Sequence, residues 1–130
     1  MIFHAYGHPN IKGTHKNTFE FTKEDHLTPT GDCIIGIRSD FDPKALGELV
    51  KRVSSLRITL IVGDEKEVIS ATANPTFSDQ TEAVVRIGEH TCPRTLAYRA
   101  SKSAKYLSRK MMELLKKGTM MEVHIEQATE

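Results

Sequence analysis

Residues 56–73 read LRITLIVGDEKEVISATA, two strand-like segments joined by the dipeptide Gly63-Asp64. Residues 56–62 and 67–73 are rich in the β-branched and aliphatic side chains that favour strands. Glycine at the first central position of a turn, followed by a small polar residue, is typical of a tight hairpin. This stretch therefore predicts an antiparallel β-hairpin near the middle of the chain.

Five further segments have the alternation or the apolar content of a strand, which brings the expected number to about seven. They are residues 2–8, 14–22, 32–38, 82–89 and 120–126. In residues 14–22, Phe19 and Phe21 point to one face and the polar residues between them point to the other.

Two helices are also expected. Asp42 can cap the first helix and Pro43 suits its first turn. The apolar stripe of this helix consists of Leu46, Leu49, Val50 and Val53. The second helix is predicted to run from Leu96 to a stop signal at Gly118, because apolar and small residues recur between them at the period of a helix. These residues are Leu96, Ala100, Ser103, Ala104, Leu107, Met111 and Leu114.

The expected order of elements is β-β-β-α-β-β-β-α-β. Hairpin-length connections dominate, so we expect a mainly antiparallel or mixed sheet that curls, with the helices against one side. No repeat, low-complexity tract or linker interrupts the chain. Residues 1–130 are therefore expected to form a single domain of the α+β class.

The composition is that of an ordinary globular protein, with 38% apolar and 27% charged residues. No apolar run approaches the roughly 20 residues that span a bilayer, so no membrane partner is expected. The first ten residues lack the basic and apolar regions of a signal peptide. Two cysteines, Cys33 and Cys92, are too few for a disulfide framework, which favours a cytoplasmic location with reduced thiols.

The histidines concentrate near the N-terminus: His4, His8, His15 and His26 are four of the six in the chain. The short connection after Pro9 is expected to bring His15 back near His8. Together with a carboxylate from Glu20 or Asp32, these imidazoles could bind zinc or another divalent metal, or act as an acid–base pair. The alternative is that they lie at a half-exposed sheet edge and bond the backbone.

The basic residues concentrate at the other end of the chain. Eight basic residues and one acidic residue lie between Arg94 and Lys117, although the net charge of the whole chain is only +1. On the expected second helix these residues form a basic face, with Arg94 and Arg99 near the helix N-terminus. Such a face can bind the phosphates of a nucleic acid or of a phosphorylated small molecule. The alternative is a solvated face that pairs with the acidic remainder of the chain.

The sequence lacks a Walker A motif, a GxGxxG turn, a GxSxG elbow and an EF-hand loop, so the common nucleotide-binding and serine-hydrolase assignments have no motif to support them. A longer pattern carries a resemblance instead. It consists of Gly7-His8-Pro9-Asn10-Ile11, Thr14-His15, Thr18, Glu20, Thr22, Leu27-Thr28, residues 31–36 (GDCIIG) and, near the C-terminus, Arg94-Thr95-Leu96-Ala97. Over nearly its full length the chain resembles the archaeal family called domain of unknown function 371. The resemblance implies an archaeal, cytosolic source and transfers no activity, cofactor or catalytic residue.

The leading hypothesis is a binding or catalytic domain for a phosphate-bearing ligand, RNA or a nucleotide. Its site would consist of His8, Asn10, His15, Thr18, Glu20, Asp32, Arg94 and Arg99. In this scheme His8 or His15 moves protons, a carboxylate from Glu20 or Asp32 orients the imidazole, and the arginines hold the anion.

Two hypotheses of other classes stay open. One is a metal-dependent hydrolase with His8 and His15 as ligands of a divalent metal. The other is a non-enzymatic assembly module whose sheet edge or basic helix docks a partner, for example a second copy of the chain. The residue pattern leaves open whether the chain is an enzyme.

Overall fold

The computed structural model describes residues 1–128 of the chain. In that part of the chain there are eight strands, two α-helices and one short 3-10 helix. Their bounds are β1 (Ile2–Tyr6), β2 (Thr18–Thr22), β3 (Ile34–Gly36), α1 (Pro43–Arg52), β4 (Ser55–Val62), β5 (Glu65–Ala73), β6 (Glu82–Arg86), β7 (Thr95–Tyr98), η1 (Ala104–Tyr106), α2 (Arg109–Lys116) and β8 (Met120–Gln127). The α+β class is confirmed, with one strand more than the sequence predicts.

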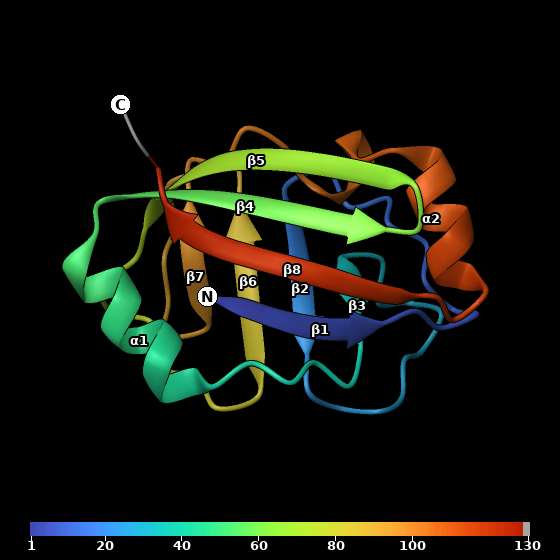
Figure 1. Ribbon diagram of the computed structural model, residues 1–130, viewed down its shortest axis with the longest axis horizontal. Coiled ribbons are helices and arrows are strands. Elements are labelled where there is room, and N and C mark those ends of the chain that lie inside the picture. Colours follow the sequence, from blue (N-terminus) through green and yellow to red (C-terminus); the bar gives the residue numbers. More distant parts are fainter. Residues whose placement is uncertain (129–130) are drawn as a thin grey trace.

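The strands form one mixed sheet in the order β1-β8-β4-β5-β7-β6-β2-β3. Two of its pairings, β2 with β3 and β6 with β7, are parallel, and the other five are antiparallel. Figure 1 shows the sheet as two layers, with β5, β4, β8 and β1 crossing in front of β7, β6, β2 and β3. The two ends of the strand order meet at one bridge between Tyr6 and Ile37, so the predicted curl is present.

The inner faces of the two layers enclose the core. Phe3 of β1 meets Phe21 of β2 edge to face, with ring centroids 5.2 Å apart. Strand β4 contributes every second side chain to the same core, and all of these are fully buried: Leu56, Ile58, Leu60 and Val62. The period of two along these strands therefore directs their apolar residues into the core, as the sequence predicts.

The hairpin and the first helix are confirmed in detail. Strands β4 and β5 pair in register up to Val62 and Glu65, around the Gly63-Asp64 turn. Helix α1 begins where expected, since the Asp42 carboxylate accepts hydrogen bonds from the backbone N–H groups of Lys44 and Ala45 at 3.0 and 3.3 Å. Leu46, Leu49 and Val50 of its apolar stripe are buried, and Val53 is half-buried. Helix α1 lies at one end of the sheet and α2 at the other (Figure 1).

The second helix is shorter than predicted. It begins at Arg109, after the Ser108 cap, and Leu96 lies instead on strand β7. Strand β7 pairs with β5 on one side and with β6 on the other, so it satisfies backbone groups that would otherwise be left at two sheet edges. The spacing of apolar residues contains no information about hydrogen bonds to distant strands. The periodicity between residues 96 and 107 therefore predicts a helix where the structure has strand β7 and the segment after it.

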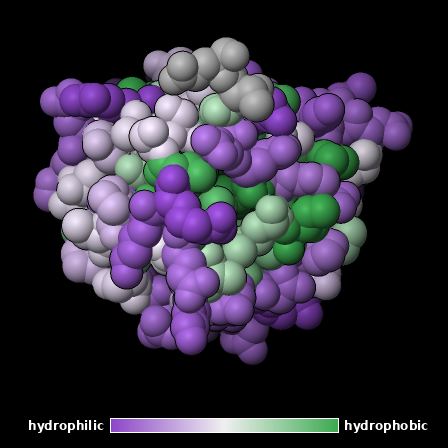
Figure 2. Space-filling model, turned by 60° about the vertical axis from the view of Figure 1, so that its left-hand side comes forward, coloured by the Kyte–Doolittle hydropathy of each residue, from purple (hydrophilic) through white to green (hydrophobic). Residues whose placement is uncertain are grey.

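The predicted basic helix face is therefore also wrong. Arg99, Lys102 and Lys105 precede α2 and do not share a helical face with its lysines. Only the C-terminal stop is as expected, with Gly118 in the left-handed region at φ +88°. No helix among residues 1–128 is long and apolar enough to cross a membrane. Seen from the α1 end, the surface is mostly hydrophilic, and hydrophobic surface gathers in one broken patch (Figure 2).

The close approach of β1 to α2 gives a prediction for stability. A Cβ added at Gly7 would lie 1.8 Å from the backbone oxygen of Leu115, so the end of β1 or the last turn of α2 has to move. We expect Gly7→Ala to lower the free energy of unfolding by about 1–3 kcal/mol, as overpacking does. Chemical denaturation measures this, with Gly88→Ala as the control because nothing lies within 4 Å of a Cβ there. Equal stability of the two variants would contradict the packing described.

Candidate functional site

The polar residues of β2 lie on the face opposite Phe19 and Phe21, and they are buried as well. Thr18, Glu20 and Thr22 are only 6%, 6% and 3% exposed. The antiparallel register places Arg86 opposite Thr18, Val84 opposite Glu20 and Glu82 opposite Thr22. Because these pairs share one face, the outer side of β2 and β6 joins hydroxyl, carboxyl and guanidinium groups. We call this surface, with the adjoining Cys33, Cys92, Arg94 and Thr95, the Glu20 face.

Glu20 is the central ionisable group of this face. The Cys33 thiol donates to its Oε1 at 3.8 Å. The pKa of Glu20 is raised from 4.5 to about 7, chiefly by burial and also by the nearby charge of Glu82, against the opposing effects of Arg94, Cys33 and Arg86. Desolvation thus outweighs the two guanidinium charges, and the carboxyl changes its protonation state near neutral pH.

Two arginines border Glu20 on the β6–β7 side. Arg94 donates from Nη1 to Glu82 Oε2 at 2.6 Å. Arg86 donates from Nε to the Thr95 hydroxyl at 3.0 Å, and its Nη2 lies 3.8 Å from the Cys92 sulfur. The guanidiniums are thus held by short contacts beside a buried carboxyl, an arrangement suited to binding an anion next to an acid–base group.

The two thiols on this face have opposite properties. Burial raises the pKa of Cys33 to about 11, and the charge of Glu20 adds to the effect. The hydrogen bond with Thr95 lowers the pKa of Cys92 to about 7, helped by Arg86. Cys33 is therefore a thiol at neutral pH, whereas Cys92 is partly a thiolate.

Of the residues predicted from the sequence, His15, Thr18, Glu20 and Arg94 come together at this face. His15 Nδ1 accepts hydrogen bonds from the backbone N–H groups of Asn17 and Thr18, both at 3.1 Å, and lies 3.1 Å from the Thr18 hydroxyl. Asp32 supports the same loop through its backbone, since its carbonyl oxygen accepts from the N–H groups of Thr14 and His15. His15 thus lies at the start of the strand that carries Glu20.

His8 and Asn10 make other contacts. His8 Nδ1 accepts from the Asn10 backbone N–H at 3.0 Å, and the Asn10 side chain donates to the Leu27 carbonyl at 2.7 Å. These bonds hold two loops together. Among residues 1–128 no three His, Cys, Asp or Glu side chains form a group that could hold a metal ion. Metal binding by His8 and His15 stays a prediction without support from this geometry.

Arg99 does not lie near the N-terminus of a helix, where the sequence predicts it as an anion-binding residue. It has a positive φ of 51°, and its Nη2 contacts Glu89 Oε1 at 2.7 Å.

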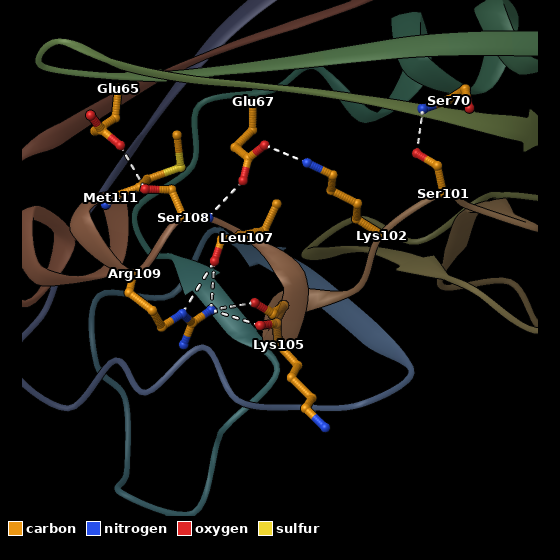
Figure 3. Close-up of polar contacts among 11 residues, drawn as sticks. Glu65, Glu67, Ser70, Ser101, Lys102, Lys105, Leu107, Ser108, Arg109 and Met111 are labelled. Carbon is orange, nitrogen blue, oxygen red and sulfur yellow. Dashed lines mark hydrogen bonds and ion pairs between the residues drawn. The ribbon is translucent and has the colours of Figure 1, made fainter.

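The N-terminus of α2 is occupied by the chain itself (Figure 3). The Ser108 hydroxyl donates to Glu65 at 2.6 Å and the Ser108 N–H donates to Glu67 at 2.6 Å, while Lys102 donates to Glu67 at 2.7 Å. Two carboxylates from β5 thus lie at the start of α2, where negative charge is favourable.

A small pocket of about 150 Å³ adjoins the Glu20 face. It shares Thr22 and Glu82 with that face, and the loop that carries His26 and Gly31 lines its other side. Sequence reasoning missed Glu82, Arg86, Cys92 and Thr95, because only the sheet pairing brings them beside Glu20. The alternation in β6 was a usable signal, since it places Glu82 and Arg86 on the same side.

The buried carboxyl predicts how stability depends on pH. The folded protein keeps a proton on Glu20 between pH 4.5 and about 7, whereas the unfolded chain has lost it. This contribution is present in full below pH 4.5 and is lost as pH rises through about 7. We expect Glu20→Gln to reduce the fall in unfolding free energy over this range by on the order of 2–3 kcal/mol.

Urea denaturation at several pH values measures this effect, and the difference between variant and parent isolates Glu20 from the histidines. Glu126→Gln is the matched control, because Glu126 is exposed. Parallel curves for Glu20→Gln and the parent protein would contradict the assignment.

Cys92 gives a separate prediction. We expect Thr95→Val to raise the pKa of Cys92 from about 7 toward its ordinary value of 9, because the largest cause of the lowering is removed. Alkylation of Cys92 by iodoacetamide at pH 7 should then slow by roughly tenfold or more. Mass spectrometry of the Cys92 peptide measures the rate. Cys33 serves as the internal reference and should react more slowly throughout. An unchanged pH profile for Cys92 would show that Thr95 does not control this thiol.

Comparison with known proteins places the chain in a family. Residues 3–128 match the family described as "Domain of unknown function (DUF371)". The chain is also 41% identical, over 124 residues, to the uncharacterized protein MJ0206 of the archaeon Methanocaldococcus jannaschii, and the match covers 91% of this chain and 92% of that protein. The resemblance noted in the sequence is thereby confirmed over nearly the whole chain, which belongs to the DUF371 family.

Proposed function

We propose that the chain binds a small phosphate-bearing molecule at the Glu20 face and moves a proton on it. The observation that carries this proposal is the position of a buried carboxyl on β2 near two guanidiniums, that of Arg86 on β6 and that of Arg94 directly before β7. A binding site for an anion and an acid–base group are thus combined on one rigid sheet face.

The arginines supply the anion-binding part. The contact of Arg94 with Glu82 uses Nη1, so the other N–H groups of this half-exposed guanidinium remain for a phosphate. Arg86 is held in place by Thr95 and presents its charge on the same side. Planar guanidiniums bind phosphate oxygens through paired hydrogen bonds, which are stronger than hydrogen bonds between neutral groups.

Glu20 supplies the acid–base part. A group that titrates near pH 7 can both accept and donate a proton under physiological conditions. His15 is the second group, because its Nδ1 accepts backbone hydrogen bonds and its Nε2 therefore carries the proton when the ring is neutral. Relative to the sequence hypothesis, the main proton carrier becomes Glu20, and Thr18 rather than a carboxylate orients the imidazole.

A small molecule fits these observations better than RNA does. Two of the basic residues expected to contact a nucleic acid, Arg99 and Lys102, are in ion pairs with glutamates at 2.7 Å. A third, Arg109, donates to backbone carbonyls of its own segment. This pairing breaks up the basic surface that would follow a nucleic-acid backbone. The adjoining pocket of about 150 Å³ also suits a small group. A cytosolic location remains part of the proposal, since both cysteines are free thiols.

The test is a titration of the ¹⁵N-labelled protein with inorganic phosphate and, separately, with adenosine monophosphate. We expect saturable shifts of the backbone amides around Thr18, Glu20 and Arg94 that weaken as salt is added. Arg94→Ala should weaken binding by roughly tenfold or more, the effect of removing one charged hydrogen-bonding partner.

Arg57→Ala is the matched control, because Arg57 also pairs with a glutamate (Glu126, at 3.3 Å) but lies on the other layer of the sheet. Equal losses in the two arginine variants, or shifts that do not involve β2, would rule out this site. Glu20→Gln should leave phosphate binding intact, which separates the binding role from the proton-transfer role.

A further inference from the structure

No helix of the described residues 1–128 covers the outer side of β1, β8, β4 and β5. Figure 1 shows these four strands in front, with α1 at one end of the layer and α2 at the other. The inward positions of these strands are buried in the core, and the alternate positions lie on the outer side, where all but Thr59 are at least partly exposed. We call this surface the open face.

The strand register arranges the open face in rows that run across the strands. The first row is Ile2, His124, Thr59 and Val68. The second row is His4, Glu122, Ile61 and Lys66. A third row contains Glu126, Arg57 and Ser70. The first row is apolar at both ends, and the third has opposite charges on its two central strands.

Exposed apolar side chains gather on this side of the protein. Within residues 1–128 the exposed large hydrophobic residues are Met1, Ile2, Val68, Tyr106 and Met120. Three of these, Ile2, Val68 and Met120, belong to β1, β5 and β8, and Met1 directly precedes β1. Concentrated apolar surface of this kind marks interaction sites.

We propose that the open face binds the open face of a second copy of this chain. The twofold axis would run parallel to the strands, between β8 and β4. This rotation exchanges the two edges of the layer, so Ile2 of one copy meets Val68 of the other. It also exchanges β8 with β4, so Glu126 of each copy meets Arg57 of the other.

The pattern of charges selects a second copy as the occupant. A twofold contact is self-complementary only if acidic and basic positions exchange under the rotation. Glu126 and Arg57 do so, since they are direct neighbours across the axis and already lie 3.3 Å apart within one chain. In the second row, Lys66 of one copy lies one strand away from Glu122 of the other, within reach of its long side chain. The open face therefore carries both partners of each ion pair.

The size of the face sets the strength of the contact. Four strands at a spacing of about 4.8 Å give a width of about 19 Å, and five residues at about 3.3 Å give a length of about 17 Å. A contact of this size buries less than roughly 1,200 Å² of total surface, which is the lower limit for a stable protein complex. We therefore expect a weak dimer that forms as concentration rises.

The first experiment uses an engineered disulfide. The double variant Ile2→Cys/Val68→Cys is made in a chain whose native thiols are removed by Cys33→Ala and Cys92→Ala. Within one chain the two positions are three strand spacings apart, about 14 Å, which is too far for a disulfide. We expect mild oxidation to give a covalent dimer linked from position 2 of one copy to position 68 of the other, identified by mass spectrometry.

The control is Ile2→Cys/Tyr106→Cys in the same background, because Tyr106 is equally exposed but lies outside the open face. Links from position 2 to position 2, or equal dimer formation in the control, would overturn the proposed arrangement.

The second experiment needs no new thiols. Sedimentation velocity of the parent chain between about 10 μM and 1 mM should show an increasing dimer fraction, as a weak interface requires. Arg57→Glu should lower the association constant by roughly tenfold or more, because it places glutamate against Glu126. The exchange Arg57→Glu/Glu126→Arg should restore it. A parent chain that stays monomeric at every concentration, or an exchange variant that is no better than Arg57→Glu, would overturn the proposal.

Discussion

Strand β2 packs Phe19 and Phe21 into the core between the two layers, and it buries Thr18, Glu20 and Thr22 on its other side. On the outer side other side chains cover the strand, since the Cys33 thiol contacts Glu20 and the His15 ring contacts Thr18. A carboxyl in such a position loses most of its water, and its pKa rises unless opposite charges compensate. The candidate site and its acid–base properties both follow from this placement.

The two arginines do not cancel the effect of burial. Arg94 is neutralised in part by Glu82, and Glu82 itself acts against the ionised form of Glu20. Arg86 directs its Nε to Thr95 and lies near the Cys92 sulfur. The two guanidiniums therefore lower the pKa of Glu20 less than burial raises it. The lowered pKa of Cys92 follows chiefly from its hydrogen bond with Thr95, with a smaller contribution from Arg86.

Elements defined by local signals were predictable. The Asp42 cap, Pro43 and the apolar stripe identify α1, and Gly63-Asp64 identifies the hairpin, because each depends on neighbours in the sequence. The region from Leu96 to Leu107 was not predictable in this way. Its apolar spacing fits a helix, but the strand pairing of β7 with β5 and β6 offers more hydrogen bonds to distant backbone groups. The periodicity of apolar residues along one segment does not predict hydrogen bonds to strands that are distant in the sequence.

The candidate site shows the same division. His15, Thr18 and Glu20 lie within six residues, so the alternation of one strand and the loop before it is enough to group them. Arg86, Cys92 and Thr95 join them only through the pairing of β2 with β6 and of β6 with β7.

The sequence by itself determined the α+β class, the first helix, the hairpin and the polar side of β2, because these depend on short-range patterns. The tertiary structure alone decided which thiol is activated, where Glu20 loses its water, and which carboxylates cover the start of α2. These properties depend on burial and on charges that lie far apart in the chain.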